Sequence, residues 1–130
     1  MKKSIMLAAA MLLLPWMIFG TGKAEAKAAK AVKIDAKEAR SMLEKGGYIL
    51  VDVRTSEEYK TGHIPGAILI PNESIIDKKP SLLPDLDASI IVYCRSGRRS
   101  ADAAAKLLKI GYKNIYDLGG IIDWPYETTV

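Results

Sequence analysis

The only cysteine of the chain, Cys94, stands in a setting that favours nucleophilic chemistry. The apolar, β-branched and aromatic run at residues 90–93 predicts a buried strand that leads into it. The Ala- and Leu-rich stretch at residues 100–108 predicts a helix that begins shortly after it. The first N–H groups of a helix lack internal partners and lie at its positive end, so they stabilise an anion. We therefore predict that Cys94 reacts as a thiolate nucleophile.

The residues after the cysteine predict a loop that binds an anion. Three of them are arginines within five residues of the sulfur, and a glycine allows the backbone to curl so that its N–H groups point inward. The expected members of this substrate-binding loop are Arg95, Ser96, Gly97, Arg98 and Arg99. The alternative is a buried structural cysteine beside solvated arginines on a surface turn. The combination of strand end, helix start and positive charge favours the reactive interpretation.

Further motifs accompany this loop in the sequence. They are Val-Asp-Val-Arg at residues 51–54, Glu-Tyr at 58–59, Gly-His-Ile-Pro-Gly-Ala at 62–67, and Leu-Gly-Gly at 118–120 followed by Trp124. With them, from about Ile34 to Trp124, the chain resembles a single-domain rhodanese, a sulfurtransferase. The resemblance implies an α/β, rhodanese-like fold with a central, mostly parallel sheet and helices on both faces. It is less specific to the substrate, because one fold hosts several activities.

Three residues outside the loop are expected to support the site. Asp52 interrupts an apolar strand, and a buried carboxylate needs a partner. The resemblance places Asp52 and Arg54 in the structural surround of the active site, where we expect a hydrogen-bonded framework. His63 is the only histidine, and we expect it to orient the backbone, because a thiol that is already ionised needs no base. One cysteine and one histidine make no ligand cluster, so we expect neither a metal nor a cofactor.

The rest of the chain alternates predicted helices with predicted strands. Two helix starts have the spacing of a capping box, Asp35 with Glu38 and Thr55 with Glu58. Predicted strands occupy residues 48–53, 68–70 and 114–118, and the alternation at residues 32–34 predicts a short edge strand. We expect Gly119 and Gly120 to form a flexible turn beside the site. The alternation predicts a parallel sheet, which binds ligands at the carboxyl ends of its strands, where Cys94 lies.

The N-terminus has the pattern of a secretory signal peptide. A short basic start, an apolar run at residues 5–19 and a small-x-small site that ends at Ala26 predict cleavage after Ala26. The apolar run is short for a membrane span and contains Pro15, although an uncleaved anchor is the alternative. We expect a periplasmic or secreted protein with no stable membrane association after cleavage. The predicted parts are a signal at 1–26, a flexible segment at 27–33 and a rhodanese domain at 34–130.

Composition narrows the range of partners. No basic stripe interleaved with aromatic residues occurs, so we expect no nucleic-acid binding. A chain with one cysteine cannot close an internal disulfide, and an odd cysteine in an exported protein invites intermolecular pairing unless its chemistry is used. We expect a monomer whose partners are a small sulfur donor and a cyanide or thiol acceptor.

The predicted reaction is sulfur transfer by double displacement. The resemblance implies that sulfane sulfur moves from thiosulfate, or a similar donor, to cyanide or a thiol through a Cys94 persulfide. A thiolate phosphatase or arsenate reductase on the same fold, and a non-enzymatic sulfur carrier, are the alternatives. Phosphatases of this type have an arginine six positions after the cysteine, but here that position is Ser100 and the last arginine is Arg99. The loop is therefore one residue short for phosphate.

Overall fold

The computed structural model describes residues 30–130. The predicted signal peptide, its cleavage site and the start of the predicted flexible segment lie outside the described residues. Within 30–130, none of the helices is both long and apolar enough to cross a membrane.

The described residues form a sheet of five strands in the order β1-β5-β4-β2-β3. All neighbouring strands run parallel, which confirms the predicted sheet and makes it more regular than "mostly parallel". Their bounds are Val32–Lys33 for β1, Tyr48–Asp52 for β2, Ile68–Leu69 for β3, Ser89–Cys94 for β4 and Asn114–Gly120 for β5. β4 lies at the centre of this order, so the end of β4 is enclosed by neighbours on both sides.

Among the described residues three α-helices connect these strands, and two of them, α2 and α3, begin at the predicted caps. They are α2 (Ala36–Lys45), α3 (Ser56–Thr61) and α4 (Arg98–Ile110), with short 3₁₀ turns η2 (Asn72–Ser74) and η3 (Ile121–Asp123). Both predicted capping boxes are present, at the starts of α2 and α3. In each box the cap side chain accepts a backbone N–H while the third helical residue reaches back to the cap, so two otherwise unpaired donors are satisfied.

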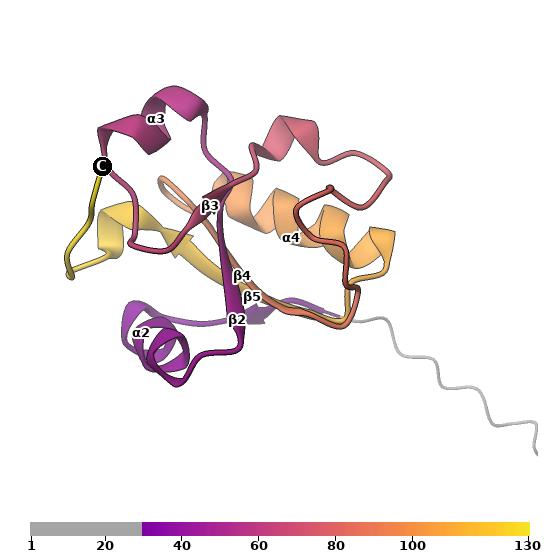
Figure 1. Cartoon of the computed structure of the whole chain (residues 1–130), viewed down its shortest axis with the longest axis horizontal. Helices are drawn as coiled ribbons and strands as arrows, with labels where there is room; N and C mark the ends of the chain where they lie inside the picture. Colours follow the sequence, from indigo (N-terminus) through magenta and orange to yellow (C-terminus); the bar gives the residue numbers. More distant parts are fainter. Residues whose placement is uncertain (1–29) are drawn as a thin grey trace, which may run out of the picture.

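Helices cover both faces of the sheet, as predicted, and the alternation along β4 shows how. Ile90 and Val92 pack in the core beneath α4, whereas Ile91 and Tyr93 pack in the core beneath α2. Figure 1 shows α2 on one side of the strands and α4 on the other. All four side chains are fully buried, each worth about 1.5–3 kcal/mol of transfer free energy. A strand buried on both faces therefore needs the continuous apolar run that precedes Cys94.

The structure changes two details at the edges of the sheet. Gly119 and Gly120, expected as a flexible turn, belong to β5 and pair with Tyr93 and Cys94. They are held in the sheet because the strand continues past a register shift opposite Val92/Tyr93. At the other edge β1 pairs with β5, which confirms the short edge strand predicted at residues 32–34 and removes residues 32–33 from the segment expected to be flexible.

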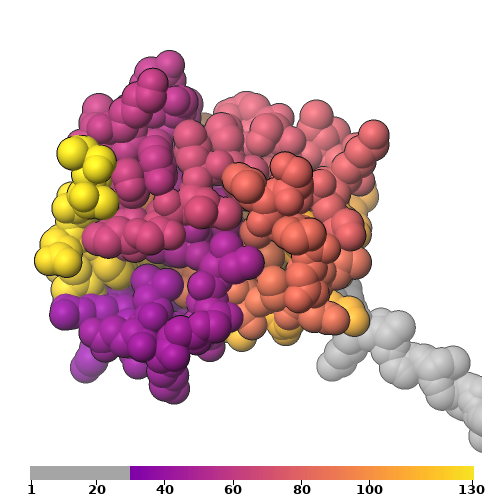
Figure 2. Space-filling model, in the orientation of Figure 1, coloured from indigo at the N-terminus to yellow at the C-terminus, as the bar shows by residue number. Residues whose placement is uncertain are grey.

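The C-terminal residues pack across one end of the domain. Thr129 and His63 exchange backbone hydrogen bonds of 2.8 Å in an antiparallel bridge. In Figure 2 the C-terminal segment, in yellow, lies between the α3 region above it and the α2 region below it. The last residues of the chain thus join the two helix-bearing regions on the side of the molecule where the motif around His63 lies.

Candidate active site

Cys94 is the last residue of β4, and α4 begins four residues later at Arg98. Gly97 caps that helix with a φ of 114°, a left-handed conformation that favours glycine. The Gly97 N–H donates to Cys94 Sγ at 3.0 Å. Cys94 is only 1% exposed, so the sulfur lies within the loop and is reached by a backbone donor. This is the anion-stabilising geometry that the sequence predicted.

The loop backbone is supported from behind by the end of β5. Gly120 lies so close that a Cβ added there would be 2.7 Å from Ser96 Cα, which leaves no room for a side chain. The Ile122 N–H donates to the Arg95 carbonyl oxygen at 3.2 Å. On the helix side, the buried Ser100 hydroxyl donates to the Gly97 carbonyl at 3.0 Å. The curled shape of the loop is therefore held on both sides of the cysteine.

The three loop arginines occupy different environments. Arg95 and Arg98 are exposed, and neither has an ion-pair partner among the described residues. Arg99 is half-buried and its two terminal nitrogens donate to the two carboxylate oxygens of Glu58, at 2.8 and 3.0 Å. The structure therefore places Arg95 and Arg98 as free cations, whereas the guanidinium of Arg99 is already engaged with another part of the fold.

The Glu58 carboxylate pairs with Arg99, a feature of the site that the sequence did not reveal. The spacing indicated only its helix-cap role, which the structure confirms, since the Thr55 N–H and hydroxyl both donate to it at 3.1 and 3.0 Å. The partner Arg99 is 41 residues away, and no local pattern connects the two. The hydrogen bonds from Arg99, followed by those from Thr55, lower the pKa of Glu58 to about 2 against the opposing effect of burial. The same carboxylate raises the pKa of Arg99.

Asp52 and Arg54 form a buried, hydrogen-bonded pair beneath the site. Arg54 Nη2 donates to Asp52 Oδ2 at 2.7 Å and to the Gly62 carbonyl at 2.7 Å. The Tyr93 hydroxyl donates to the same Asp52 oxygen at 2.8 Å and accepts the Ile64 N–H at 3.1 Å. Tyr93 directly precedes Cys94, so the network connects the strand that carries the nucleophile with β2 and with residues 62–64. Burial and the Asp52 charge raise the pKa of Tyr93, which keeps its hydroxyl protonated as a donor.

His63 is placed for a structural role. Its Nδ1 lies 2.9 Å from the Tyr59 carbonyl oxygen, and its ring stacks on the Tyr59 ring at a centroid distance of 3.7 Å. The Tyr59 hydroxyl donates to the Ala67 carbonyl at 2.7 Å, which closes the turn over residues 62–67. One ring nitrogen and one ring face of His63 are thus occupied within this turn, and its orienting role stays a prediction.

A hollow of about 530 Å³ borders the loop. Ser96 and Gly97 line it from the loop side, and Lys33, Lys37 and Trp124 contribute to its other walls. Trp124 packs, partly buried, against the core and also lines this hollow. The hollow lies at the carboxyl ends of β1 and β5, which is where open parallel sheets bind ligands.

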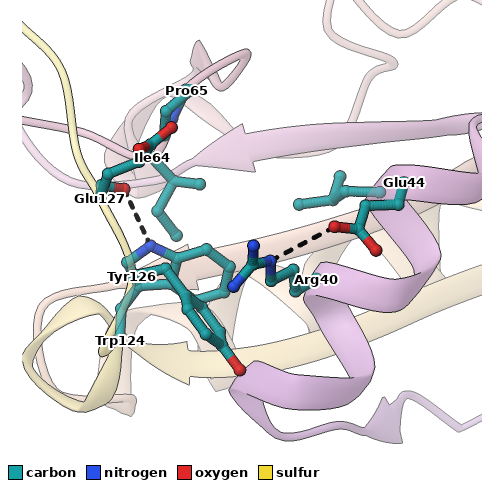
Figure 3. A pocket seen from close by; sticks show the side chains of 8 residues that line it. Arg40, Glu44, Ile64, Pro65, Trp124, Tyr126 and Glu127 are labelled. Carbon is teal, nitrogen blue, oxygen red and sulfur yellow. Dashed lines mark hydrogen bonds and ion pairs between the residues drawn. The ribbon is translucent and has the colours of Figure 1, made fainter.

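A second hollow, of about 370 Å³, lies on the α2 side and contains no residue of the cysteine loop. Figure 3 shows it between α2 and the C-terminal segment. Arg40 stacks over the Tyr126 ring at 4.4 Å and pairs with Glu44 at 3.4 Å, and Trp124 Nε1 donates to the Glu127 carbonyl. Within residues 30–130 no group of three or more His, Cys, Asp or Glu side chains could hold a metal ion.

The fold and the site together define a class of protein: a parallel α/β domain with a buried cysteine cradled by a helix-start loop. A family model for the rhodanese-like domain matches residues 35–126. The chain therefore belongs to the rhodanese-like family, as the resemblance implied. Among solved structures, the human single-domain sulfurtransferase TSTD1 is 29% identical with a TM-score of 0.64, over 73% of this chain and 96% of that one.

The curated relatives have different activities. Thiosulfate sulfurtransferase PspE of Escherichia coli is 36% identical over 56% of this chain and 70% of that protein. The tRNA uridine(34) hydroxylase of Photorhabdus laumondii is 33% identical over 70% of this chain but only 27% of its own length. The probable adenylyltransferase/sulfurtransferase MoeZ of Mycobacterium tuberculosis is 41% identical over 78% of this chain and 26% of its own length. This chain thus spans about a quarter of the two longer relatives, and its relatives include sulfurtransferases.

Replacing Tyr93 with phenylalanine is expected to lower the free energy of unfolding by about 1–3 kcal/mol, because the buried Ile64 N–H loses its acceptor. Urea denaturation measures this. Tyr116→Phe is the control, since Tyr116 is half-buried and its hydroxyl makes no hydrogen bond to another group of residues 30–130. Equal stabilities of the two variants would contradict a role for the Tyr93 hydroxyl in the network.

The lowered pKa of Glu58 predicts a pH-dependent contribution to stability. A carboxyl whose pKa falls from 4.5 to about 2 on folding stabilises the protein fully above pH 4.5, and this contribution disappears as the pH falls toward 2. The stability difference between the native protein and Glu58→Gln should therefore shrink over that interval, as followed by denaturant titrations. Glu57→Gln, at an exposed neighbouring position, is the control. A difference that stayed constant down to pH 2 would rule out this linkage.

Proposed function

We propose that the protein is a sulfurtransferase that takes sulfane sulfur from thiosulfate, or a similar donor, and passes it to cyanide or a thiol. The observation that carries the proposal is the Gly97 N–H, which donates to Cys94 Sγ at 3.0 Å inside a loop at the start of α4. A persulfide formed on Cys94 would extend the anion into the same loop, where backbone donors stabilise it without a side-chain base.

In the first half-reaction the Cys94 thiolate attacks the outer sulfur of thiosulfate. An Sγ–S bond forms, the bond between the outer sulfur and the sulfonate sulfur breaks, and its electron pair leaves with sulfite. In the second half-reaction cyanide attacks the terminal sulfur of the persulfide, and the Sγ–S electron pair returns to Cys94 as thiocyanate leaves. A thiolate acceptor would leave as a persulfide in the same way. Neither step needs a metal or an external oxidant.

Donor capture is assigned to the exposed arginines. Thiosulfate carries two negative charges, and the exposed Arg95 and Arg98 have no ion-pair partner among residues 30–130. Their positions at the loop and at the first residue of α4 surround the approach to Cys94 with positive potential. Planar guanidinium groups can also hold the sulfonate oxygens by paired hydrogen bonds.

Two observations favour sulfur over phosphate. The sixth position after Cys94 is Ser100, whose buried hydroxyl bonds the Gly97 carbonyl, so no guanidinium lies where a phosphatase loop would need one. The nearest arginine before it, Arg99, is held by Glu58. The similarity to thiosulfate sulfurtransferase PspE supports the same choice. Hydroxylation is not proposed, because the hydroxylase relatives extend far beyond the part that this chain matches.

We also propose that the protein is exported to the periplasm or secreted as a monomer. The basic, apolar and small-residue pattern of residues 1–26 supports this location, with cleavage after Ala26. Its partners would then be small sulfur donors and acceptors met outside the cytoplasm, with no nucleic acid and no lasting contact with the membrane. In an oxidising compartment a single cysteine has no second cysteine in its chain with which to form a disulfide. Its use as a persulfide carrier would explain why such a thiol is present.

Incubation with thiosulfate should add one sulfur to Cys94, detected by mass spectrometry of the intact protein and of its peptides. Cys94→Ser should show neither this addition nor turnover of thiosulfate to thiocyanate, because the nucleophile is gone. Aryl phosphates serve as the control substrates and should be hydrolysed negligibly. Cys94-dependent phosphate hydrolysis at rates that rival sulfur transfer would overturn the assignment, and persulfide formation without turnover would indicate a sulfur carrier.

Arg95→Ala and Arg98→Ala should mainly raise KM for thiosulfate, with smaller effects on kcat. The reason is that exposed cations attract the dianion before the chemical step, so added salt should produce the same change in the native protein. Steady-state kinetics at several ionic strengths measure both effects. An unchanged KM in both variants together with no salt dependence would argue against electrostatic capture.

The export proposal predicts a mature protein that begins near Lys27. N-terminal sequencing of material recovered from the export compartment tests this, since a signal peptidase would remove residues 1–26. Protein recovered there with Met1 intact would show that the signal is not cleaved.

A further inference from the structure

We infer that Glu58 is a positioning residue for the cysteine loop, acting by holding Arg99 and so fixing the start of α4 against α3. This inference rests on the proposed sulfur transfer and specifies how the loop is kept in its reactive shape. It also assigns the loop arginines different roles. Arg99 has a structural role, whereas Arg95 and Arg98 bind the sulfur donor.

The contact geometry supports a rigid connection. Arg99 Nη1 and Nη2 each donate to a different oxygen of Glu58, at 2.8 and 3.0 Å, which is a two-bond pairing of matched planar groups. The side chains are only 22% and 27% exposed, so water screens the pair less than it would at the surface. Arg99 is the second residue of α4, two positions after the Gly97 N–H that donates to Sγ. A shift of Arg99 would therefore move the amide that stabilises the sulfur.

The Glu58 side chain is itself held in place by its own helix. Its Oε1 accepts both the N–H and the hydroxyl of Thr55, which begins α3. The Thr55 segment directly follows Arg54, which is buried with Asp52. The contacts therefore run from the buried Asp52–Arg54 pair through the start of α3 to the start of α4. Because Thr55 and Arg99 both donate to it, the Glu58 carboxylate is held in one position and has little freedom to move when a substrate binds.

The same pairing decides which charges a donor meets. Glu58 neutralises Arg99, and thiosulfate could bind that guanidinium only by displacing a carboxylate that already makes both hydrogen bonds. Arg95 and Arg98 have no such competitor among the described residues. Removal of the Glu58 charge should therefore slow the sulfur-bearing step without weakening donor binding, whereas removal of Arg95 or Arg98 should do the reverse.

The first experiment is single-turnover formation of the Cys94 persulfide at saturating thiosulfate, measured by rapid quench and mass spectrometry. Glu58→Gln should react about 10- to 100-fold more slowly than the native protein, with no rise in the thiosulfate concentration needed for half-saturation. Thr55→Val is the matched control: it removes the cap hydroxyl but leaves both Arg99 bonds, so it should lower the melting temperature and keep the native rate. Equal slowing of both variants would mean that Glu58 acts only as a helix cap.

A double-mutant cycle tests whether Glu58 acts through Arg99. The double variant Arg99→Ala/Glu58→Gln should react at the same rate as Arg99→Ala alone. If the double variant instead lost the product of the two single-variant rate reductions, the inference would be overturned. A raised half-saturation concentration with an unchanged rate would instead place the pair in donor binding. If Glu58→Gln does not fold, Arg99→Lys replaces it, because lysine keeps the charge and loses the two-bond geometry.

A second readout separates this inference from the proposed function. The pH profile of Cys94 alkylation by iodoacetamide needs no sulfur donor and reports the thiolate directly. Glu58→Gln should shift this profile, and Thr55→Val should not. A native protein that forms no persulfide would defeat the proposed function, while the alkylation profiles would still decide the role of Glu58. Identical profiles in all three proteins would refute that role.

Discussion

The site depends on the stabilisation of a nearly buried sulfur by a backbone donor. Cys94 is 1% exposed, and the Gly97 N–H donates to its Sγ at 3.0 Å from a loop in which a left-handed glycine turns the chain into α4. Such a donor needs no charge and no proton transfer, but it acts only if the loop keeps its shape. The surrounding structure meets this demand: β5 supports the loop through Gly120, Ser100 holds the Gly97 carbonyl, and the start of α4 is tied to α3.

The buried polar groups beneath the loop serve the same purpose in a less direct way. An unpaired Asp52 would be costly in this core, and the Arg54 guanidinium, the Tyr93 hydroxyl and the Arg54 N–H satisfy it. Since Tyr93 directly precedes the nucleophile, these bonds place the end of β4 relative to β2. Arg54 and Arg99 are thus neutralised by the carboxylates of Asp52 and Glu58. Arg95 and Arg98, which have no ion-pair partner among the described residues, are exposed to solvent.

Fold and reaction are separate questions in this family. The rhodanese-like domain is shared by short sulfurtransferases and by longer enzymes such as the tRNA uridine(34) hydroxylases, of which this chain covers 27%. What distinguishes one member from another must lie in the loop length, the charges that face the substrate and the neighbouring hollow. Here these are a loop with Ser100 at the sixth position after Cys94, two free arginines and a hollow bordered by Ser96 and Gly97.

Local signals in the sequence were enough for the parallel α/β architecture, both capping boxes and the place of Cys94 between strand and helix, because each depends on residues only a few positions apart. Contacts between distant segments were decided by the tertiary structure alone. Glu58 looked like a simple cap until α3 and α4 brought it to Arg99 across 41 residues, and Gly119–Gly120 looked like a turn until β4 paired with them. The physical reason is that hydrogen-bond partners far apart in the chain leave no periodicity in the sequence, so only the packing of the helices and strands determines which charge remains free.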